Sequence, residues 1–485
     1  MLFLLSRSKK HLSNPNNLKK GGAYIVGLVI FTRVVTFIGQ WVLGLYLFPS
    51  DFAIIAILNI SILIISGLKE NGVAFLIMGS RDDLETKFWE FTSSAYILSL
   101  IAIIILLFAS PIFYYIYEDF RIIELILISL PSLFFTVVCS SYRAILNVEF
   151  KFKEISIYEG LGVAITSVSL IFLAFIGFSV YSIPISQLLG IMTQSFLYKR
   201  SANNYIQDFK KDNFLRNGFD NIKKFKWTVS NSYISSLVLN GDYLILSFTI
   251  TKISLGYYYF GYQLVSSMIQ VISTSINYLI LPVFSSIRSN RTKALDAFYD
   301  GLHMISFISG GFCLGTIMLV PFLIDYFWSG KWNGSIMVVV AILAIMPIRL
   351  ISSPFSTSII DAFEKYREKF YILALEGIST IIIVYLSSSI YGLNGAVIGL
   401  LFQRATFGLI QYFYVIRLLG GSIFLFTKLM LKVNVPFYSS LLFLSKIEVN
   451  KIEDINIMYA VCIVTYLMLA YVFNRNGIKL IFKKK

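Results

Sequence analysis

The sequence predicts an all-α polytopic membrane protein with about fourteen transmembrane helices, counted in runs of about 20 apolar residues. Of its 485 residues, 57% are hydrophobic and 14% are charged, whereas soluble domains carry about 25% charged residues. Lipid can cover the apolar faces of helices that a soluble domain would have to bury. Most basic residues lie between the apolar runs, as expected for loops retained in the cytoplasm.

The apolar runs follow one another with short connections, apart from one long polar segment in the middle of the chain. This segment, 199–226, holds eight basic and three acidic residues, and we interpret it as a cytoplasmic link between two halves. The predicted spans are 22–48, 52–78, 88–115, 121–146, 155–178, 180–199, 227–250, 255–283, 295–327, 333–361, 370–390, 393–417, 430–446 and 455–473.

The distribution of basic residues predicts the orientation of these spans. With the N-terminus inside, the inside segments carry thirty Lys and Arg and the outside segments carry five. The positive-inside rule therefore places both termini in the cytoplasm. The net charge of +15 lies in loops and tails, which favours membrane topology over nucleic-acid binding. The apolar start of the chain is too short for a signal peptide, so the first span should be retained.

The two halves of the chain resemble each other. Glu159-Gly160 opens the fifth span and Glu376-Gly377 opens the eleventh, and each pair precedes an apolar run, a short turn and another span. Six spans separate the equivalent positions, so the two copies point the same way across the membrane. The predicted domains are an N-terminal lobe, a basic linker, a C-terminal lobe and two additional helices with a basic tail, at 1–199, 200–226, 227–418 and 419–485.

Several stretches, taken in order, are similar to the Wzx-type polysaccharide exporters of the multidrug/oligosaccharidyl-lipid/polysaccharide (MOP) flippase superfamily. Their order and spacing, more than any one motif, carry the resemblance, which extends over nearly the whole chain. The stretches are Leu68-Lys-Glu-Asn-Gly-Val-Ala, Ala144-Ile-Leu-Asn-Val-Glu-Phe-Lys-Phe-Lys153, Leu173-Ala-Phe-Ile-Gly-Phe-Ser-Val180, Asn240-Gly-Asp-Tyr-Leu-Ile-Leu, Leu255-Gly-Tyr-Tyr and Leu281-Pro-Val-Phe-Ser-Ser.

The resemblance implies two parallel six-helix lobes in a V around a central cavity. It also implies a transporter rather than an enzyme, which moves an undecaprenyl-pyrophosphate-linked oligosaccharide from the inner to the outer leaflet of the bacterial cytoplasmic membrane. O-antigen, capsule and exopolysaccharide repeat units are the substrate class. The expected partners are this substrate, membrane lipids and the polysaccharide polymerase and export machinery. No cofactor is expected, and coupling to H⁺ or Na⁺ is left open.

Charged residues inside the spans are the main candidates for substrate contact. Each Arg or Lys at the centre of a membrane helix costs about 2.5–3.5 kcal/mol on insertion scales, so it should meet water, an acid or an anionic substrate. Arginine binds phosphate oxygens bidentately, which suits a pyrophosphate. We therefore expect three cavity cations, namely Arg33, Lys69 and Arg349.

Ion pairing within the protein is the alternative for these charges. Asp242 is either an ion or proton site or the partner of Arg349. Arg404 is a weaker candidate, which could pair with Glu376 across the turn between spans 11 and 12. Glu159 and Glu376 are themselves interpreted as structural acids in the first turns of their helices, where the helix dipole favours them.

A polar face on the eighth span forms the second candidate set. Its residues follow a spacing close to 3.6 and so share one side of a helix, where amides and an aromatic ring suit sugars. Membrane-interface anchoring is the competing explanation for the tyrosine. The four residues are Tyr259, Gln263, Gln270 and Asn277.

Other functions and sites find less support in the sequence. A cation-coupled multidrug or small-molecule antiporter of the same superfamily is the alternative function, although the excess of Arg and Lys over acids in the spans disfavours it. A membrane glycosyltransferase should show a catalytic acid cluster or a large external loop. The three cysteines have no metal-binding spacing, and no metal site is predicted. His303 is interpreted as an ordinary helix residue.

Overall fold

The computed structural model describes residues 15–69, 72–80, 83–206, 214–445 and 452–474. This part of the chain is helical and contains no strand. It divides into two compact units, Met1–Leu244 and Ile245–Lys485. Six helical stretches in the described part are long and apolar enough to cross a membrane: Leu84–Tyr117, Arg121–Val148, Phe152–Phe175, Arg291–Trp328, Asn333–Ala362 and Arg367–Leu419.

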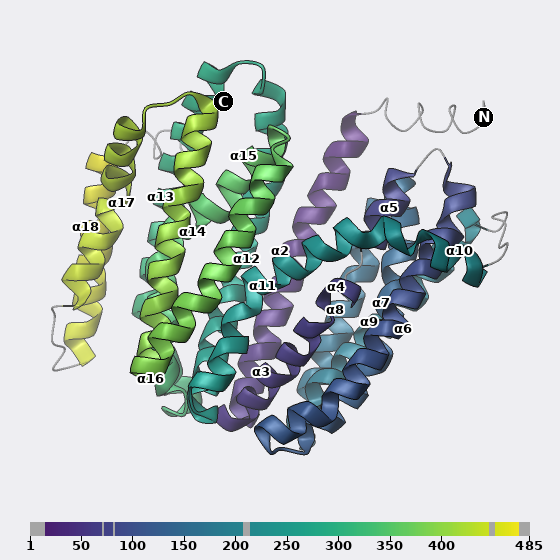
Figure 1. Cartoon of the computed structure of the whole chain (residues 1–485). Coiled ribbons are helices and arrows are strands. Elements are labelled where there is room, and N and C mark those ends of the chain that lie inside the picture. Colours follow the sequence, from purple (N-terminus) through teal and green to yellow (C-terminus); the bar gives the residue numbers. More distant parts are fainter. Residues whose placement is uncertain (1–14, 70–71, 81–82, 207–213, 446–451, 475–485) are drawn as a thin grey trace. The chain divides into compact units, whose positions relative to one another are not determined.

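The first unit is built mainly from long helices that pack side by side (Figure 1). Helix α9 packs on both α7 and α8, and α2 packs on α8. The elements are α2 (Pro15–Tyr46), α3 (Pro49–Ile64), α4 (Ser66–Lys69), α5 (Val73–Gly79), α6 (Leu84–Tyr117), α7 (Arg121–Val148), α8 (Phe152–Phe175), the short helix η2 (Ser179–Tyr181), α9 (Ser182–Ile206), α10 (Phe214–Asn221), η3 (Ile222–Phe225) and α11 (Lys226–Thr249), whose last turn belongs to the second unit.

The second unit is organised around α13 and α14, which pack on each other. Helix α14 also packs on α12 and α16, and α17 packs on α13 and α18. The elements are α12 (Lys252–Ile287), α13 (Arg291–Trp328), α14 (Asn333–Leu350), the π-helical turn η4 (Ile351–Ser356), α15 (Thr357–Ala362), α16 (Tyr366–Leu419), α17 (Ile423–Ser445) and α18 (Ile452–Phe473).

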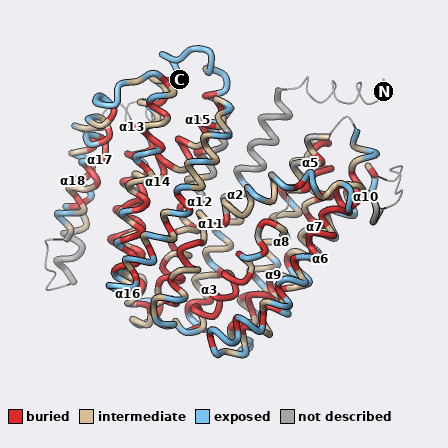
Figure 2. The backbone as a smooth tube through the Cα atoms, in the orientation of Figure 1, coloured by how far each residue is buried: buried red, intermediate tan, exposed pale blue. Residues whose placement is uncertain are grey.

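Buried and exposed residues lie on the same helices in both units (Figure 2). Large apolar side chains remain accessible along the long helices, with Phe108, Tyr115 and Phe424 each more than three-quarters exposed. In water such exposure would be costly, whereas lipid covers it without penalty. The exposed apolar surface therefore agrees with a multi-pass membrane protein.

Three predicted elements differ from the structure. The second span is not one helix, because the backbone turns at Ile65 and Gly72 takes a left-handed φ of 76°, which separates α3, α4 and α5. The tenth span is continuous but contains the π-helical turn η4, where Pro354 lacks the N–H needed for the regular ladder. The central segment 199–226 is largely helical, since α9 continues to Ile206 and α10 and η3 follow.

The predicted turn between spans 11 and 12 is confirmed. Helix α16 is two helices that meet at Gly392, whose φ of 58° and ψ of −137° are not helical. A side-chain amide on the second half, that of Gln403, donates to the backbone oxygen of Glu376 on the first half at 3.2 Å, so the halves lie side by side.

Candidate functional site

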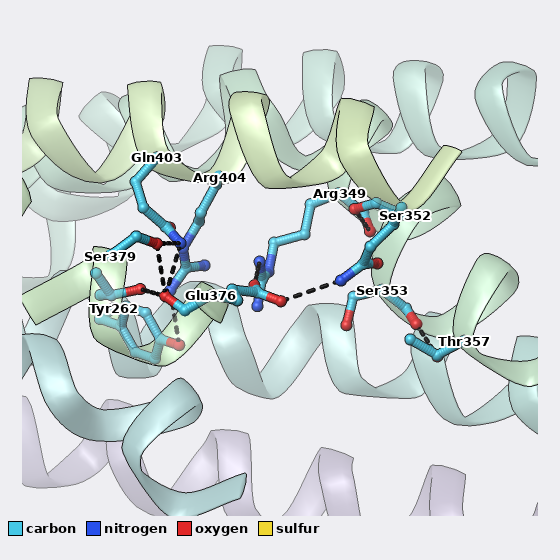
Figure 3. Close-up of polar contacts among 11 residues, drawn as sticks. Tyr262, Arg349, Ser352, Ser353, Thr357, Glu376, Ser379, Gln403 and Arg404 are labelled. Carbon is cyan, nitrogen blue, oxygen red and sulfur yellow. Dashed lines mark hydrogen bonds and ion pairs between the residues drawn. The ribbon is translucent and has the colours of Figure 1, made fainter. Parts of the chain in front are cut away.

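A buried ion pair joins α14 to α16 in the second unit (Figure 3). Arg349 Nη1 lies 3.1 Å from Glu376 Oε1, and the two side chains are only 13% and 5% exposed. The other carboxylate oxygen, Oε2, accepts a hydrogen bond from Gln411 Nε2 at 3.0 Å. Both oxygens of the carboxylate therefore have a donor, as a buried charge requires.

The backbone around Glu376 is also held by side chains. Its carbonyl oxygen accepts hydrogen bonds from Ser379 Oγ at 2.9 Å, Thr380 Oγ1 at 2.8 Å and Gln403 Nε2 at 3.2 Å. Figure 3 shows Gln403 reaching this carbonyl from the opposite half of the α16 hairpin. These contacts fix the place of the carboxylate between the two halves of α16 and α14.

A second arginine lies beside this pair. Arg404 is 4% exposed, and its Nη2 donates to the hydroxyl of Tyr262 on α12 at 3.3 Å. The guanidinium carbon lies 5.5 Å from the centre of the same ring, within range of a cation–π contact. Arg404 is close enough to Arg349 for the two positive charges to repel each other. The cluster thus brings two cations and one anion together inside the second unit.

The first unit contains a related arrangement. Arg143 Nη2 on α7 lies 2.9 Å from Glu159 Oε2 on α8, with side chains 43% and 29% exposed. Gln194 Nε2 on α9 donates to the backbone oxygen of Glu159 at 3.4 Å. Arg33 on α2 is near enough to Glu159 for a favourable electrostatic interaction. This centre is therefore more open than its counterpart around Glu376.

The two centres occupy equivalent places in the internal repeat. In each unit a glutamate of the fifth helix of the repeat pairs with an arginine of the fourth, and a glutamine of the sixth helix donates to the glutamate. The separation between Glu159 and Gln194 is the same 35 residues as between Glu376 and Gln411. The close approach in the first unit needs a small residue, since a Cβ on Gly162 would lie 2.2 Å from Gln194 Cγ.

Comparison with known proteins shows the family to which this chain belongs. A family model described as polysaccharide biosynthesis protein matches residues 42–337, more than half of the chain. The chain belongs to this family. One relative of this polysaccharide biosynthesis protein is an "Uncharacterized membrane protein in cps region" of Klebsiella pneumoniae. It is 22% identical over 403 residues, which cover 80% of each chain.

Solved structures of MOP superfamily members share the fold. The lipid II flippase MurJ in an inward closed conformation matches with a TM-score of 0.73 at 18% identity, over 94% of this chain and 99% of its own. An inward-facing multidrug resistance transporter of the MATE family has a TM-score of 0.62 at 17% identity, over 81% and 94% of the two chains. A MOP superfamily transporter from Pyrococcus furiosus has a TM-score of 0.55 at 15% identity, over 83% and 96%. These structures confirm the fold that the sequence resemblance implied.

The candidate cations of this polysaccharide biosynthesis protein lie in three different environments. Arg33 is half-buried on α2, and its Nε is a buried donor without a hydrogen-bond partner among the described residues. Lys69 is the last residue of the short helix α4, beside the break in the second span, and is half-buried. Arg349 has Glu376 as its carboxylate partner. Of the three, Arg33 has unused capacity for an anion.

The partner of Arg349 differs from the one considered from the sequence. The carboxylate beside Arg349 belongs to Glu376, whereas Asp242 had been the candidate. Asp242 is buried on α11, and its Oδ1 accepts a hydrogen bond from the backbone N–H of Tyr243 at 3.0 Å. The structure thus brings Arg349, Arg404 and Glu376 together in one cluster.

The interpretation of the two glutamates as first-turn residues is wrong. Helix α8 begins at Phe152 and has Glu154 in its first turn, so Glu159 lies further along. Helix α16 begins at Tyr366, so Glu376 is in its third turn and the helix dipole does not account for it. Their arginine partners, Arg143 and Arg349, account for the positions of the two carboxylates. Sequence reasoning missed Arg143, Gln194 and Gln411, although the shared 35-residue spacing was a signal for the glutamines.

The polar face of α12 changes in exposure along its length. Tyr259 is buried, Gln263 is half-buried and accepts a weak hydrogen bond from Ser266 Oγ at 3.4 Å, and Gln270 is exposed. The side chain of Asn277 lies outside the described residues. Gln270 is therefore the described member of this set that solvent or a ligand can reach.

His303 has a more specific role than that of an ordinary helix residue. It is buried on α13, and its Nδ1 lies 2.6 Å from Asn474 Oδ1, just beyond α18. Asn474 Nδ2 in turn donates to the backbone oxygen of His303 at 2.9 Å. The pair fixes the end of the last described helix to α13. Among the described residues, no group of three His, Cys, Asp or Glu is placed to hold a metal ion.

Proposed function

We propose that this membrane protein is a flippase for an undecaprenyl-pyrophosphate-linked oligosaccharide, a repeat unit of O-antigen, capsule or exopolysaccharide. Membership of the polysaccharide biosynthesis family and the fold shared with MOP transporters support the reaction class. In the chain itself, the observation that supports it most directly is Arg33, a cation in the first predicted span with a buried donor unpartnered among the described residues. A pyrophosphate would supply the missing acceptor.

The architecture proposed for this function has fourteen spans in two parallel six-helix lobes that form a V around a central cavity. Residues 200–226 link the lobes, and the last two helices lie outside the repeat. Both termini face the cytoplasm at the bacterial cytoplasmic membrane, as the thirty inside basic residues support. Alternating access then carries the head group across, coupled to H⁺ or Na⁺ if the step is driven, and delivers it to a polysaccharide polymerase.

Arg33 and Lys69 are the proposed cavity cations, and Arg349 contributes through its pair with Glu376. If Arg33 binds the pyrophosphate, its role depends on both charge and fork geometry. Arg33→Ala should then abolish export, and Arg33→Lys should restore only part of it. The matched control is Arg291→Ala, which removes an exposed arginine at the start of α13.

The deciding measurement is lipid analysis of a strain that lacks the protein and carries each variant. Loss of function should leave a complete undecaprenyl-linked repeat unit facing the cytoplasm, and the mass of this intermediate defines the glycan. Membrane insertion of Arg33→Ala is measured in parallel and should equal that of the unmodified chain. Normal export by Arg33→Ala would refute the role of this cation. Drug sensitivity without the lipid intermediate would instead identify a cation-coupled antiporter.

A further inference from the structure

Within the described part of the central segment, residues 218–225 of α10 and η3 pack against the rest of the first unit, and we call these residues the platform. In α10 and η3, buried or half-buried residues recur at a helical spacing, at Gly218, Asn221, Ile222 and Phe225. Helix α10 packs on α6 along this stripe (Figure 1). Between residues 218 and 226 the others are exposed, namely Phe219, Asp220, Lys223, Lys224 and Lys226.

Close contacts hold the buried stripe of α10 and η3 against α6. Ser94 Oγ donates to the backbone oxygen of Gly218 at 2.7 Å. A Cβ on Gly218 would lie 2.8 Å from Ile97 Cδ1 and 2.9 Å from Ser93 Oγ, so only glycine permits this approach. Phe225 is 1% exposed, and its ring packs edge to face on the ring of Phe91, with the ring centres 6.2 Å apart. The platform is therefore part of the first unit's core.

The opposite side of the platform carries an aromatic ring among lysines. Phe219 is 62% exposed, and Lys223 follows it one helical turn later. Lys224 is also exposed, with its Nζ 5.5 Å from the centre of the Phe91 ring. Two acids are nearby: Asp220 is exposed on the same stretch, and Glu90 accepts a hydrogen bond from Asn221. Because its Nζ lies over the ring of Phe91, Lys224 is at the edge of this face towards α6. Three lysines against the two acids leave the face positive.

An exposed aromatic beside lysines on a packed amphipathic helix is the pattern of a segment that lies in the membrane interface. The lysines come directly before the apolar part of α11, and lysine clusters at the cytoplasmic end of a membrane helix attract anionic headgroups. We propose that the face formed by Phe219, Lys223, Lys224 and Lys226 binds the phosphates of anionic phospholipids in the cytoplasmic leaflet. This inference rests on the proposed topology.

The ring at position 219 allows a direct test of lipid contact. The Phe219→Trp variant of the full chain is reconstituted in vesicles that contain either dibrominated phosphatidylglycerol or dibrominated phosphatidylcholine. The same lipids also quench the five native tryptophans. This background is measured on the unmodified chain and subtracted. The introduced tryptophan should be quenched more by the anionic lipid, and the preference should fall at high salt because surface charges are screened.

The lysines provide the second arm of the test. In the Phe219→Trp background, Lys223→Gln with Lys224→Gln should lower the preference for phosphatidylglycerol by about fivefold for each lysine. Arg291→Gln with Lys293→Gln removes the same charge from the exposed start of α13 and should leave the preference unchanged. Gly218→Ala should lower the preference without removing charge, because the added Cβ displaces α10 from α6.

Equal quenching by the two lipids would overturn the proposal and leave only an apolar anchor. Absence of quenching would place the face in water and would also overturn it. The assay requires no transport, so the lipid preference and the flippase function can fail independently of each other.

Discussion

Breaking the ion pair between Arg349 and Glu376 should strongly destabilise the second unit, and Glu376→Gln tests this. The substitution keeps the shape of the side chain and an acceptor for Gln411 but removes the negative charge. Arg349, whose side chain is 13% exposed, then loses its carboxylate. Removal of one partner from a buried pair costs about 3–5 kcal/mol.

The repeat supplies a matched control for this prediction. Glu159→Gln removes the equivalent carboxylate in the first unit, but its partner Arg143 is 43% exposed and water can replace the lost contact. Exposed pairs contribute about 0.2–1 kcal/mol. Glu376→Gln should therefore destabilise the protein several times more than Glu159→Gln. Replacing both partners, with Arg349→Met and Glu376→Gln together, should recover part of the loss, because Arg349 is then no longer a buried charge without its carboxylate. Arg404 stays buried in the same cluster, so the recovery should be incomplete.

The protein's own cysteines provide the assay. Cys139, Cys313 and Cys462 are free and buried, so a thiol-reactive dye reports unfolding on heating in detergent. For a unit of this size, a loss of 3–5 kcal/mol lowers the midpoint on the order of 10 °C. Equal shifts for Glu376→Gln and Glu159→Gln would refute the argument from burial. An unchanged midpoint for Glu376→Gln would show that the pair does not stabilise the fold.

Two further substitutions test other contacts with the same dye assay. Gly392→Ala places a side chain at φ 58° and ψ −137°, with no atom within 4 Å of the new Cβ. The expected loss of about 1–3 kcal/mol in the free energy of unfolding is therefore due to backbone strain alone. An unchanged unfolding midpoint would mean that the turn relaxes. Asn474→Ala removes the buried partner of His303, so it should lower the free energy of unfolding by about 1–3 kcal/mol and raise protease cleavage after α18. His303→Ala should raise the same cleavage. A difference between the two variants would contradict a shared contact.

The fold class could be predicted because it depends on composition along the chain. Runs of apolar residues and the basic segments between them indicate an all-α membrane protein without any knowledge of contacts. The breaks within spans could not be predicted in this way. Pro354 lies in an apolar stretch, where hydrophobicity continues through a break that depends on local backbone geometry. The break at Gly72 follows the polar residues Lys69, Glu70 and Asn71, which were interpreted as lying inside a span.

The candidate site was predicted less completely because pairing depends on three-dimensional contacts. Arg349 and Glu376 are 27 residues apart, and the choice between Glu376 and Asp242 as partner requires knowledge of which helix packs on α14. The position of Glu376 was misjudged because polar residues at the start of α16 conceal where the helix begins. The repeat already matched Glu159 with Glu376, and the spacing shared by the two Glu–Gln pairs could have added the glutamines.

The difference between the two centres follows from how many donors reach each carboxylate. Glu376 receives Arg349 on one oxygen and Gln411 on the other, so its charge can be withdrawn from solvent. Gln194 instead donates to the backbone of Glu159, whose carboxylate has Arg143 on one oxygen and stays partly accessible. A carboxylate with a donor on each oxygen exchanges partners only at the cost of breaking a buried contact.

An open centre can exchange partners at lower cost. Arg33 lies within electrostatic range of Glu159, in the centre that remains accessible. An arriving phosphate could therefore take the guanidinium of Arg33 without first breaking a buried pair. The same phosphate would have to displace Glu376 to reach Arg349. We therefore propose that the first unit's centre responds to substrate, whereas the second unit's centre has a structural role. Arg33→Ala should accordingly reduce export far more than it reduces the unfolding midpoint, whereas Glu376→Gln should reduce both together.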